Sequence, residues 1–154
     1  RVSKRQEDRI VKDQFEAKQT SRGEMEQAYI NVIETGAGEW AIASLVQLGK
    51  VNENMAHSLR NSHVPTYLEN ERQINFYKAA MNDNALQLLD RALTYYTQAL
   101  AKAYEIGLYN EFTAFANERR SEILPADYPP LVEDLLDPGY SSTAKTTASY
   151  VTEY

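Results

Sequence analysis

The 154-residue sequence contains no cysteine, which excludes disulfide bonds and every form of thiol chemistry. It has only two histidines, His57 and His63, and a single tryptophan, Trp40. No stretch comes near the ~18 continuous apolar residues that a membrane-spanning helix needs. We therefore expect neither disulfide-stabilised structure nor membrane insertion of this segment.

Basic side chains are also in the minority, with 16 Lys and Arg against 22 Asp and Glu, a net charge of −6. Proteins that bind nucleic acid or an anionic membrane surface need a basic face, so neither is an expected partner. Apolar residues make up 43% of the chain, enough for one domain with a core. Because the chain begins at Arg1 rather than Met, we expect it to belong to a longer or processed protein.

Apolar residues recur at three- and four-residue steps, which indicates amphipathic helices. Gly23 is a possible break in the first of them. The first twenty residues are so polar that we expect this part to project, or to pack on something outside the chain. The polar stretch 81–85 marks a possible bend, so the third segment is either one bent helix or two. The expected helical segments are 1–34, 39–61, 67–107 and 109–124, with Gly107 as a C-cap and Asn110 as an N-cap.

A short glycine-containing turn, Gly36-Ala37-Gly38, separates the first two helical segments. A phosphate-binding loop would need a further glycine or a Lys-Ser/Thr pair, and neither follows. The turn instead fits the joint of an antiparallel helical hairpin. Small residues at Ala43, Gly49, Ala92 and Ala99 would let helices approach closely, and large ones at Trp40, Leu48, Tyr96 and Tyr104 would fill the spaces between them.

The composition changes after Pro125. Residues 126–154 are first proline-rich and then rich in Ser and Thr, with a possible helical turn at 130–136. We expect a helical domain over 1–125 and an extended tail that docks on its own helices or on a neighbouring molecule.

Two patterns resemble halves of a tetratricopeptide repeat: Leu45-x2-Leu48-Gly49-x2-Asn52 for the first helix, and Ala92-x3-Tyr96-x2-Ala99 for the second. Residues 28–129 are similar to the C-terminal part of large bacterial proteins of this class, found in the envelopes and gliding-motility machineries of deltaproteobacteria. Tyr104 stands at the usual proline position, and the two halves lie too far apart for one repeat. The resemblance therefore implies an all-α, repeat-like solenoid without a defined number of repeats.

The resemblance implies a non-enzymatic scaffold that binds a protein or peptide, in a bacterial envelope or motility assembly. Its periplasmic or envelope location rests on the resemblance alone. The segment 139–154 is a second candidate ligand, through which the chain would self-associate. For Trp40, packing at the hairpin is favoured over a role as an exposed anchor. The candidate partner-binding residues are Trp40, Asn52, Tyr77, Tyr95 and Asn110.

The alternative is a structural module that oligomerises through the helix at 1–34. That segment lacks the sustained apolar seam of a coiled coil over three heptads, which counts against pairing of this kind. Of the adjacent Tyr95 and Tyr96, which point about 100° apart on a helix, only one is expected to be fully buried.

Catalytic and metal-binding patterns are sparse. Glu53 and His57 share a helix face, but no further ligand is fixed near them, and the paired Glu-x-x-His motifs of di-metal bundles are absent. No G-x-S-x-G motif accompanies the serines. We therefore expect no metal, no cofactor and no catalysis, unless Glu53 and His57 are buried together among other polar groups. Arg119 and Arg120 could pair with the acids at 133, 134 and 137.

Overall fold

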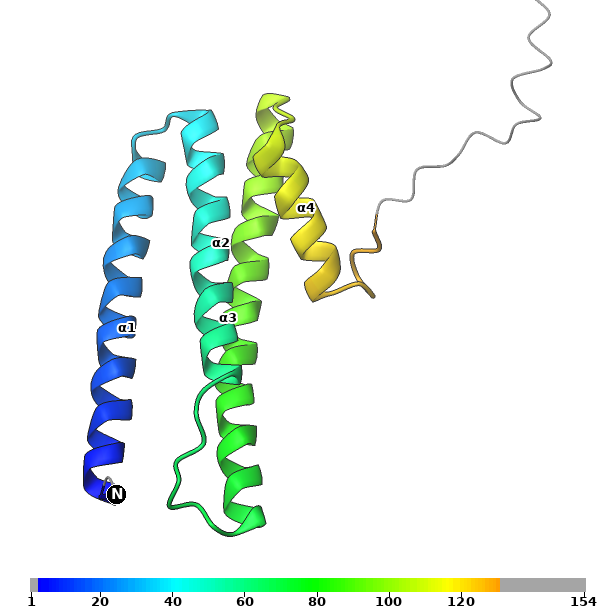
Figure 1. The fold of residues 1–154 in the computed structure, drawn as a ribbon. Helices are drawn as coiled ribbons and strands as arrows, with labels where there is room; N and C mark the ends of the chain where they lie inside the picture. Colours follow the sequence, from blue (N-terminus) through cyan, green and yellow to red (C-terminus); the bar gives the residue numbers. More distant parts are fainter. Residues whose placement is uncertain (1–2, 131–154) are drawn as a thin grey trace, which may run out of the picture.

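The computed structural model describes residues 3–130 and is all-helical over that range, with no strand. The predicted all-α architecture of antiparallel hairpins is confirmed (Figure 1). The four helices are α1 (Lys4–Glu34), α2 (Gly38–Arg60), α3 (Glu71–Ile106) and α4 (Glu111–Ile123).

Local sequence signals set the helix ends. Gly36 has a positive φ of 72°, which makes the sharp turn between α1 and α2 possible without a Cβ clash. Gly107 (φ 65°) ends α3 in the left-handed conformation, as predicted. Asn70 and Asn110 cap α3 and α4, because each side-chain oxygen accepts from a free backbone N–H of the first turn. The predicted N-cap at Asn110 is thus confirmed.

The possible break at Gly23 does not occur, and of the two alternatives for the third segment the structure has the single helix. Gly23 lies inside an unbroken α1, and residues 81–85 lie inside a single α3. A lone glycine costs a helix only about 1 kcal/mol, and the contacts that a helix makes elsewhere along its length outweigh that cost.

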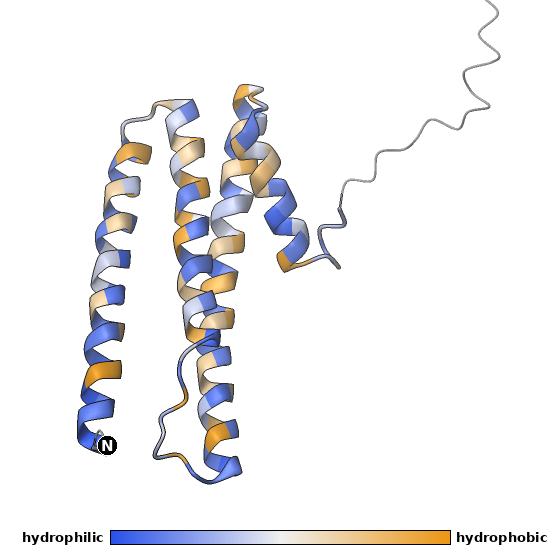
Figure 2. Cartoon of the chain, in the orientation of Figure 1, coloured by the Kyte–Doolittle hydropathy of each residue, from blue (hydrophilic) through white to orange (hydrophobic). Residues whose placement is uncertain are grey.

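The helix α2 lies at the centre of the array (Figure 1). It contacts α1, α3 and α4, whereas α4 also packs against α3; within the described part, the α1 backbone approaches only α2 among the helices. In Figure 2 most of α1 is hydrophilic, and none of its residues is buried. The core therefore lies between α2, α3 and α4, and α1 covers one side of α2.

The helices α2 and α3 approach most closely, among their glycine positions, at Gly49 of α2 and Tyr96 of α3. The Tyr96 ring is fully buried and packs edge-to-face on Phe115 of α4, with ring centroids 6.1 Å apart. The predicted roles of Leu48 and of the small residues in the core are confirmed, since all of them are buried. The prediction that Trp40 and Tyr104 fill spaces between helices is wrong, because Trp40 is 67% exposed and Tyr104 is 82% exposed.

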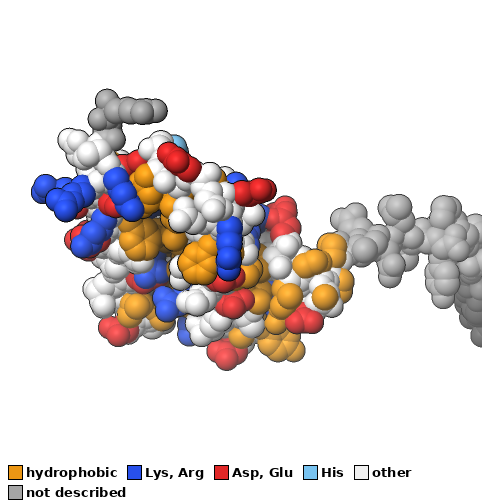
Figure 3. All heavy atoms as spheres, turned by 90° about the horizontal axis from the view of Figure 1, so that it is seen from below, with side chains coloured by type: hydrophobic (Ala, Val, Ile, Leu, Met, Phe, Trp, Pro, Cys, Tyr) orange, Lys and Arg blue, Asp and Glu red, His pale blue; other side chains and the backbone are white. Residues whose placement is uncertain are grey.

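The N-terminal end of α1 does not project, contrary to expectation. The Glu7 carboxylate accepts hydrogen bonds from the backbone N–H (2.9 Å) and the hydroxyl (2.7 Å) of Thr66, in the loop between α2 and α3. The Tyr67 hydroxyl donates to Asp8 (2.6 Å), and Lys4 lies over the Tyr67 ring. We call this set of contacts the α1–loop latch. Figure 3, which looks onto this end from below, shows charged side chains around apolar ones.

The latch is expected to open at acid pH. Hydrogen bonds from Thr66 hold the pKa of the Glu7 carboxyl below its usual 4.5. Because the folded pKa is the lower one, the stabilisation from the Glu7–Thr66 hydrogen bonds is fully present above pH 4.5 and is lost as the pH falls through the folded value. In NMR titrations the Thr66 amide proton shift should therefore titrate with a midpoint below 4.5. Glu7→Gln should abolish that titration, and an unchanged titration in this variant would contradict the assignment.

A candidate binding groove between α3 and α4

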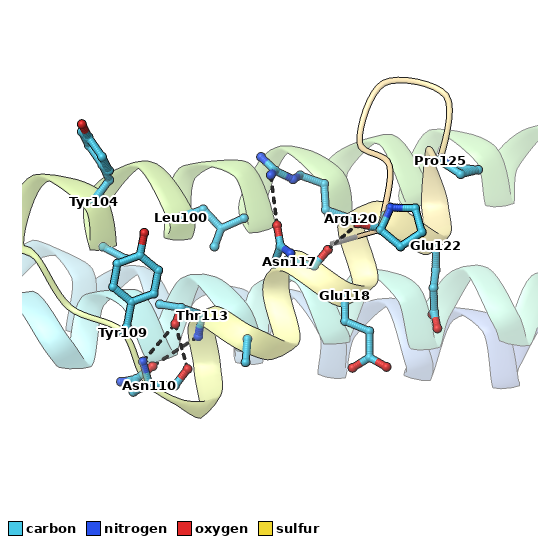
Figure 4. A pocket seen from close by; sticks show the side chains of 14 residues that line it. Leu100, Tyr104, Tyr109, Asn110, Thr113, Asn117, Glu118, Arg120, Glu122 and Pro125 are labelled. Carbon is cyan, nitrogen blue, oxygen red and sulfur yellow. Dashed lines mark hydrogen bonds between the residues drawn. The ribbon is translucent and has the colours of Figure 1, made fainter. Parts of the chain in front are cut away.

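A groove of about 1200 Å³ lies between α3 and α4 (Figure 4). We call it the α3–α4 groove. The helix α4 diverges from α3 toward its C-terminal end (Figure 1), and residues of both helices line the groove. Most of its lining is apolar. The residues that line the groove include Leu100, Tyr104, Tyr109, Ala114, Arg120 and Pro130.

The turn between the two helices fixes the closed end of the groove. Asn110 and Thr113 form a reciprocal capping box across the first turn of α4, in which the side chain of each accepts a hydrogen bond from the backbone N–H of the other. Tyr104 and Tyr109 stand on either side of Gly107, and both are 82% exposed. Two rigid aromatic rings with polar tips are therefore held at the mouth of an apolar groove, an arrangement common in binding surfaces.

Arg120 is the basic residue of the groove lining. Its guanidinium lies 4.1 Å from the centre of the Tyr128 ring and donates to the Asn117 side chain at 3.2 Å. Its Nε is buried and has no hydrogen-bond partner in the described structure. Glu118 and Glu122 also line the groove, so its charged lining residues are two acids and one base (Figure 4). A buried donor without an acceptor costs about 1–3 kcal/mol, and because this Nε is enclosed by the protein it does not face the open groove.

A second polar cluster joins α2 to α4 behind the groove. Arg119 donates to both oxygens of the Glu53 carboxylate, at 3.1–3.2 Å from Nε and 2.5 Å from Nη2, and also contacts Glu122. The hydrogen bonds to Glu53 raise the pKa of Arg119, so this cation stays charged. Burial raises the pKa of the nearby Tyr96 hydroxyl, and the Glu53 charge adds to that shift. The cluster thus acts as a fixed ion pair between helices.

Glu53 and His57 do not form a catalytic pair. Both line a depression of about 380 Å³, but the Glu53 carboxylate is held by Arg119 and His57 is exposed, with its ring nitrogen 3.1 Å from the Asn61 amide. Glu53 and His57 are therefore not buried together, which is the arrangement that would favour an enzyme. Within residues 3–130 no three His, Asp or Glu side chains are grouped so that they could hold a metal ion.

The structure scatters the five predicted site residues. Asn110 lines the α3–α4 groove, whereas Trp40 lies exposed on α2, Tyr95 is half-buried against the core, and Tyr77 donates to the His63 carbonyl at 3.2 Å. Asn52 is fully buried between α1 and α2 and donates to Glu26 and to the Leu48 carbonyl. Its burial removes Asn52 from any surface that a partner could reach.

Tyr104 and Tyr109 line the groove but are not among the five predicted site residues. They flank the glycine that ends α3, so a tight turn brings them to one end of the hairpin. The chain also makes contacts with α4 just after that helix ends. The Tyr128 N–H donates to the Leu124 carbonyl (3.0 Å), and the Tyr128 ring lies against the Arg120 guanidinium. Residues 126–130 thus pack on α4. The rest of the predicted tail, 131–154, and the acids proposed to pair with Arg119 and Arg120 lie outside the described residues.

None of the helices described has the length and hydropathy needed to cross a membrane. Comparisons with protein-family models, with curated proteins and with solved structures give no match to this chain.

Proposed function

We propose that the chain is a non-enzymatic scaffold that binds an amphipathic helical segment of a partner protein in the α3–α4 groove. The observation that carries the proposal is the groove itself: an open, largely apolar hollow of about 1200 Å³ with two exposed tyrosines at its mouth. Apolar grooves between helices commonly accept the apolar face of another helix.

The lining indicates the kind of partner that fits. Most of the lining is apolar, and its charged residues are Glu118, Arg120 and Glu122. A helix with one apolar face would fill the groove. Membership of a bacterial envelope or motility assembly rests only on the tetratricopeptide resemblance, and it stays a prediction.

Oligomerisation through α1 is the weaker proposal. Ile10, Phe15 and Met25 are 49%, 41% and 45% exposed, so α1 does present apolar side chains to solvent. Their spacing of five and ten residues does not form the three- and four-residue seam that pairs two helices over several heptads.

A displayed library of random peptides tests the binding proposal. Residues 131–136 follow Pro130 in the sequence and include four apolar side chains, so the selection is run on the full chain and on its Leu135→Asp variant. We expect enriched peptides with apolar residues three and four apart. Ala114→Arg, in the groove, should weaken the best peptide about tenfold or more, because a buried charge and lost contact cost at least ~1.4 kcal/mol.

The matched control is Ala101→Arg, since Ala101 is exposed on α3 but does not line the groove. That variant should bind the peptide as wild type does. Failure to enrich any peptide on either chain, or equal binding by the two arginine variants, would sink the proposal.

A further inference from the structure

We propose that α1 exchanges between two copies of the chain, so that the α1 of each copy covers the α2 of the other in a domain-swapped dimer. The partner that this surface fits is thus a second copy of the same chain. The proposal does not rest on the α3–α4 groove, because the exchange leaves α3 and α4 in place. It also differs from the pairing of two α1 helices, in which each α1 would stay on its own α2.

The contacts that hold α1 can be remade between two copies. Within the described part of the chain, the α1 backbone approaches only α2 among the helices. Its side chains reach the same region, since Glu26 accepts from the Asn52 amide (3.0 Å) and Lys18 donates to Ser58. The α1–loop latch adds contacts to the loop at 61–70. Because these partners lie on α2 or directly after it, an α1 from a second copy meets the same partners.

The helix α1 is held loosely for its length. None of its 31 residues is buried, so its own apolar surface changes little when it detaches. At the contact with α2, Arg22 Nε and Asn52 Oδ1 are buried without a hydrogen-bond partner in the described structure. Both can pair with water once α1 leaves. Elements with few buried contacts open before the core does, so α1 can detach while α2, α3 and α4 stay packed.

The face of α2 beneath α1 requires a cover. Asn52, which donates to Glu26 of α1, is fully buried, and so is Leu48, one helical turn earlier on the same face. Detachment of α1 exposes this face to water, which is unfavourable for its apolar side chains. The α1 of a second copy covers the face again and restores each of the hydrogen bonds made there.

The turn between α1 and α2 is the hinge of the exchange. It consists of residues 35–37, and Gly36 closes it with a φ of 72°. With a helical φ at Gly36, α1 and α2 form one continuous helix, and α1 points away from its own α2. Glycine adopts both conformations, but it weakens a helix interior. The closed monomer is therefore favoured at low concentration and the exchanged dimer at high concentration.

The Gly36→Ala variant tests the hinge. A positive φ is unfavourable for a residue with a Cβ, and alanine forms helix better than glycine. Each hinge should then favour the open form about tenfold, and a dimer contains two hinges, so the dimer dissociation constant should fall about 100-fold. Light scattering over a concentration series measures it. The control, Gly23→Ala, lies inside α1 and should leave dimerisation unchanged.

Crosslinking in the full chain identifies the exchanged arrangement, and the absence of cysteine gives a clean background. Lys18→Cys on α1 is combined with Ser58→Cys on α2. The protein is refolded at low and at high concentration, and then diluted before a short bismaleimide is added, so that chance encounters between copies are rare. The control pair, Ser62→Cys with Tyr77→Cys, joins the loop to α3 and should bridge within one chain at both concentrations.

Covalent dimers from the first pair, in a share that rises with the refolding concentration and with Gly36→Ala, are the expected result on a denaturing gel. Internal bridges alone from the chain that keeps Gly36 would overturn the proposal. That holds even where light scattering shows a dimer, because each α1 would then lie on its own α2. Equal dimer dissociation constants for Gly36→Ala and Gly23→Ala would overturn it as well.

Discussion

Replacing Gly49 by alanine should destabilise the protein by about 2–3 kcal/mol, the upper part of the usual range for an overpacked core. A Cβ at this position would lie 2.5 Å from Cζ and 2.8 Å from Cδ1 of the Tyr96 ring, and closer still to Cε1. The ring has nowhere to move, because it is fully buried and its other side meets Phe115. The helices α2 and α3 must therefore separate, and urea unfolding followed by circular dichroism would measure the loss.

The control is the same substitution at Gly23, an exposed position in the middle of α1. A Cβ there meets nothing within 4 Å, so Gly23→Ala should stabilise by about 0.5–1 kcal/mol through helix propensity alone. Tyr96→Leu should also reduce the cost of Gly49→Ala when the two are combined, because the clash is with the ring. Equal effects of the two glycine substitutions would show that the close approach is absent.

The sequence was a good guide to the helices because their ends carry strong signals. Gly36, Gly107 and the asparagine caps each act within one turn of the chain, so local chemistry decides them. Positions inside a helix were harder. Gly23 weakens a helix locally, but the latch at one end of α1 and its packing along α2 are long-range contacts that no local pattern contains.

Burial of individual side chains was predicted less well, and Trp40 shows why. It lies about 160° around α2 from the fully buried Ile42, so its exposure could have been deduced from the helical wheel. The exposure of Tyr104 could not, because it depends on where α4 crosses α3. The α3–α4 groove exists only through that crossing, and accordingly only Asn110 among the predicted site residues belongs to it.

Removing the Glu53 carboxylate from the ion pair between α2 and α4 should also cost the protein much of its stability. Arg119 binds two carboxylates whose side chains differ in exposure, Glu53 at 15% and Glu122 at 53%. Breaking a buried pair costs several kcal/mol, and exposed pairs contribute ~0–1 kcal/mol. Since Arg119 is itself 33% exposed, we expect Glu53→Ala to cost about 2 kcal/mol and Glu122→Ala less than about 0.5 kcal/mol.

Unfolding in urea would compare the two variants, and a double-mutant cycle between Glu53 and Arg119 should show a coupling of about 1–2 kcal/mol. Because Arg119 is common to both pairs, the difference between the two variants reports only on where the removed carboxylate lies. A cost for Glu122→Ala as large as that for Glu53→Ala would mean that Arg119 does not join α2 to α4. In that case α4, and with it one wall of the groove, would be held by the apolar packing of Phe112, Phe115, Ala116 and Ile123 on the core.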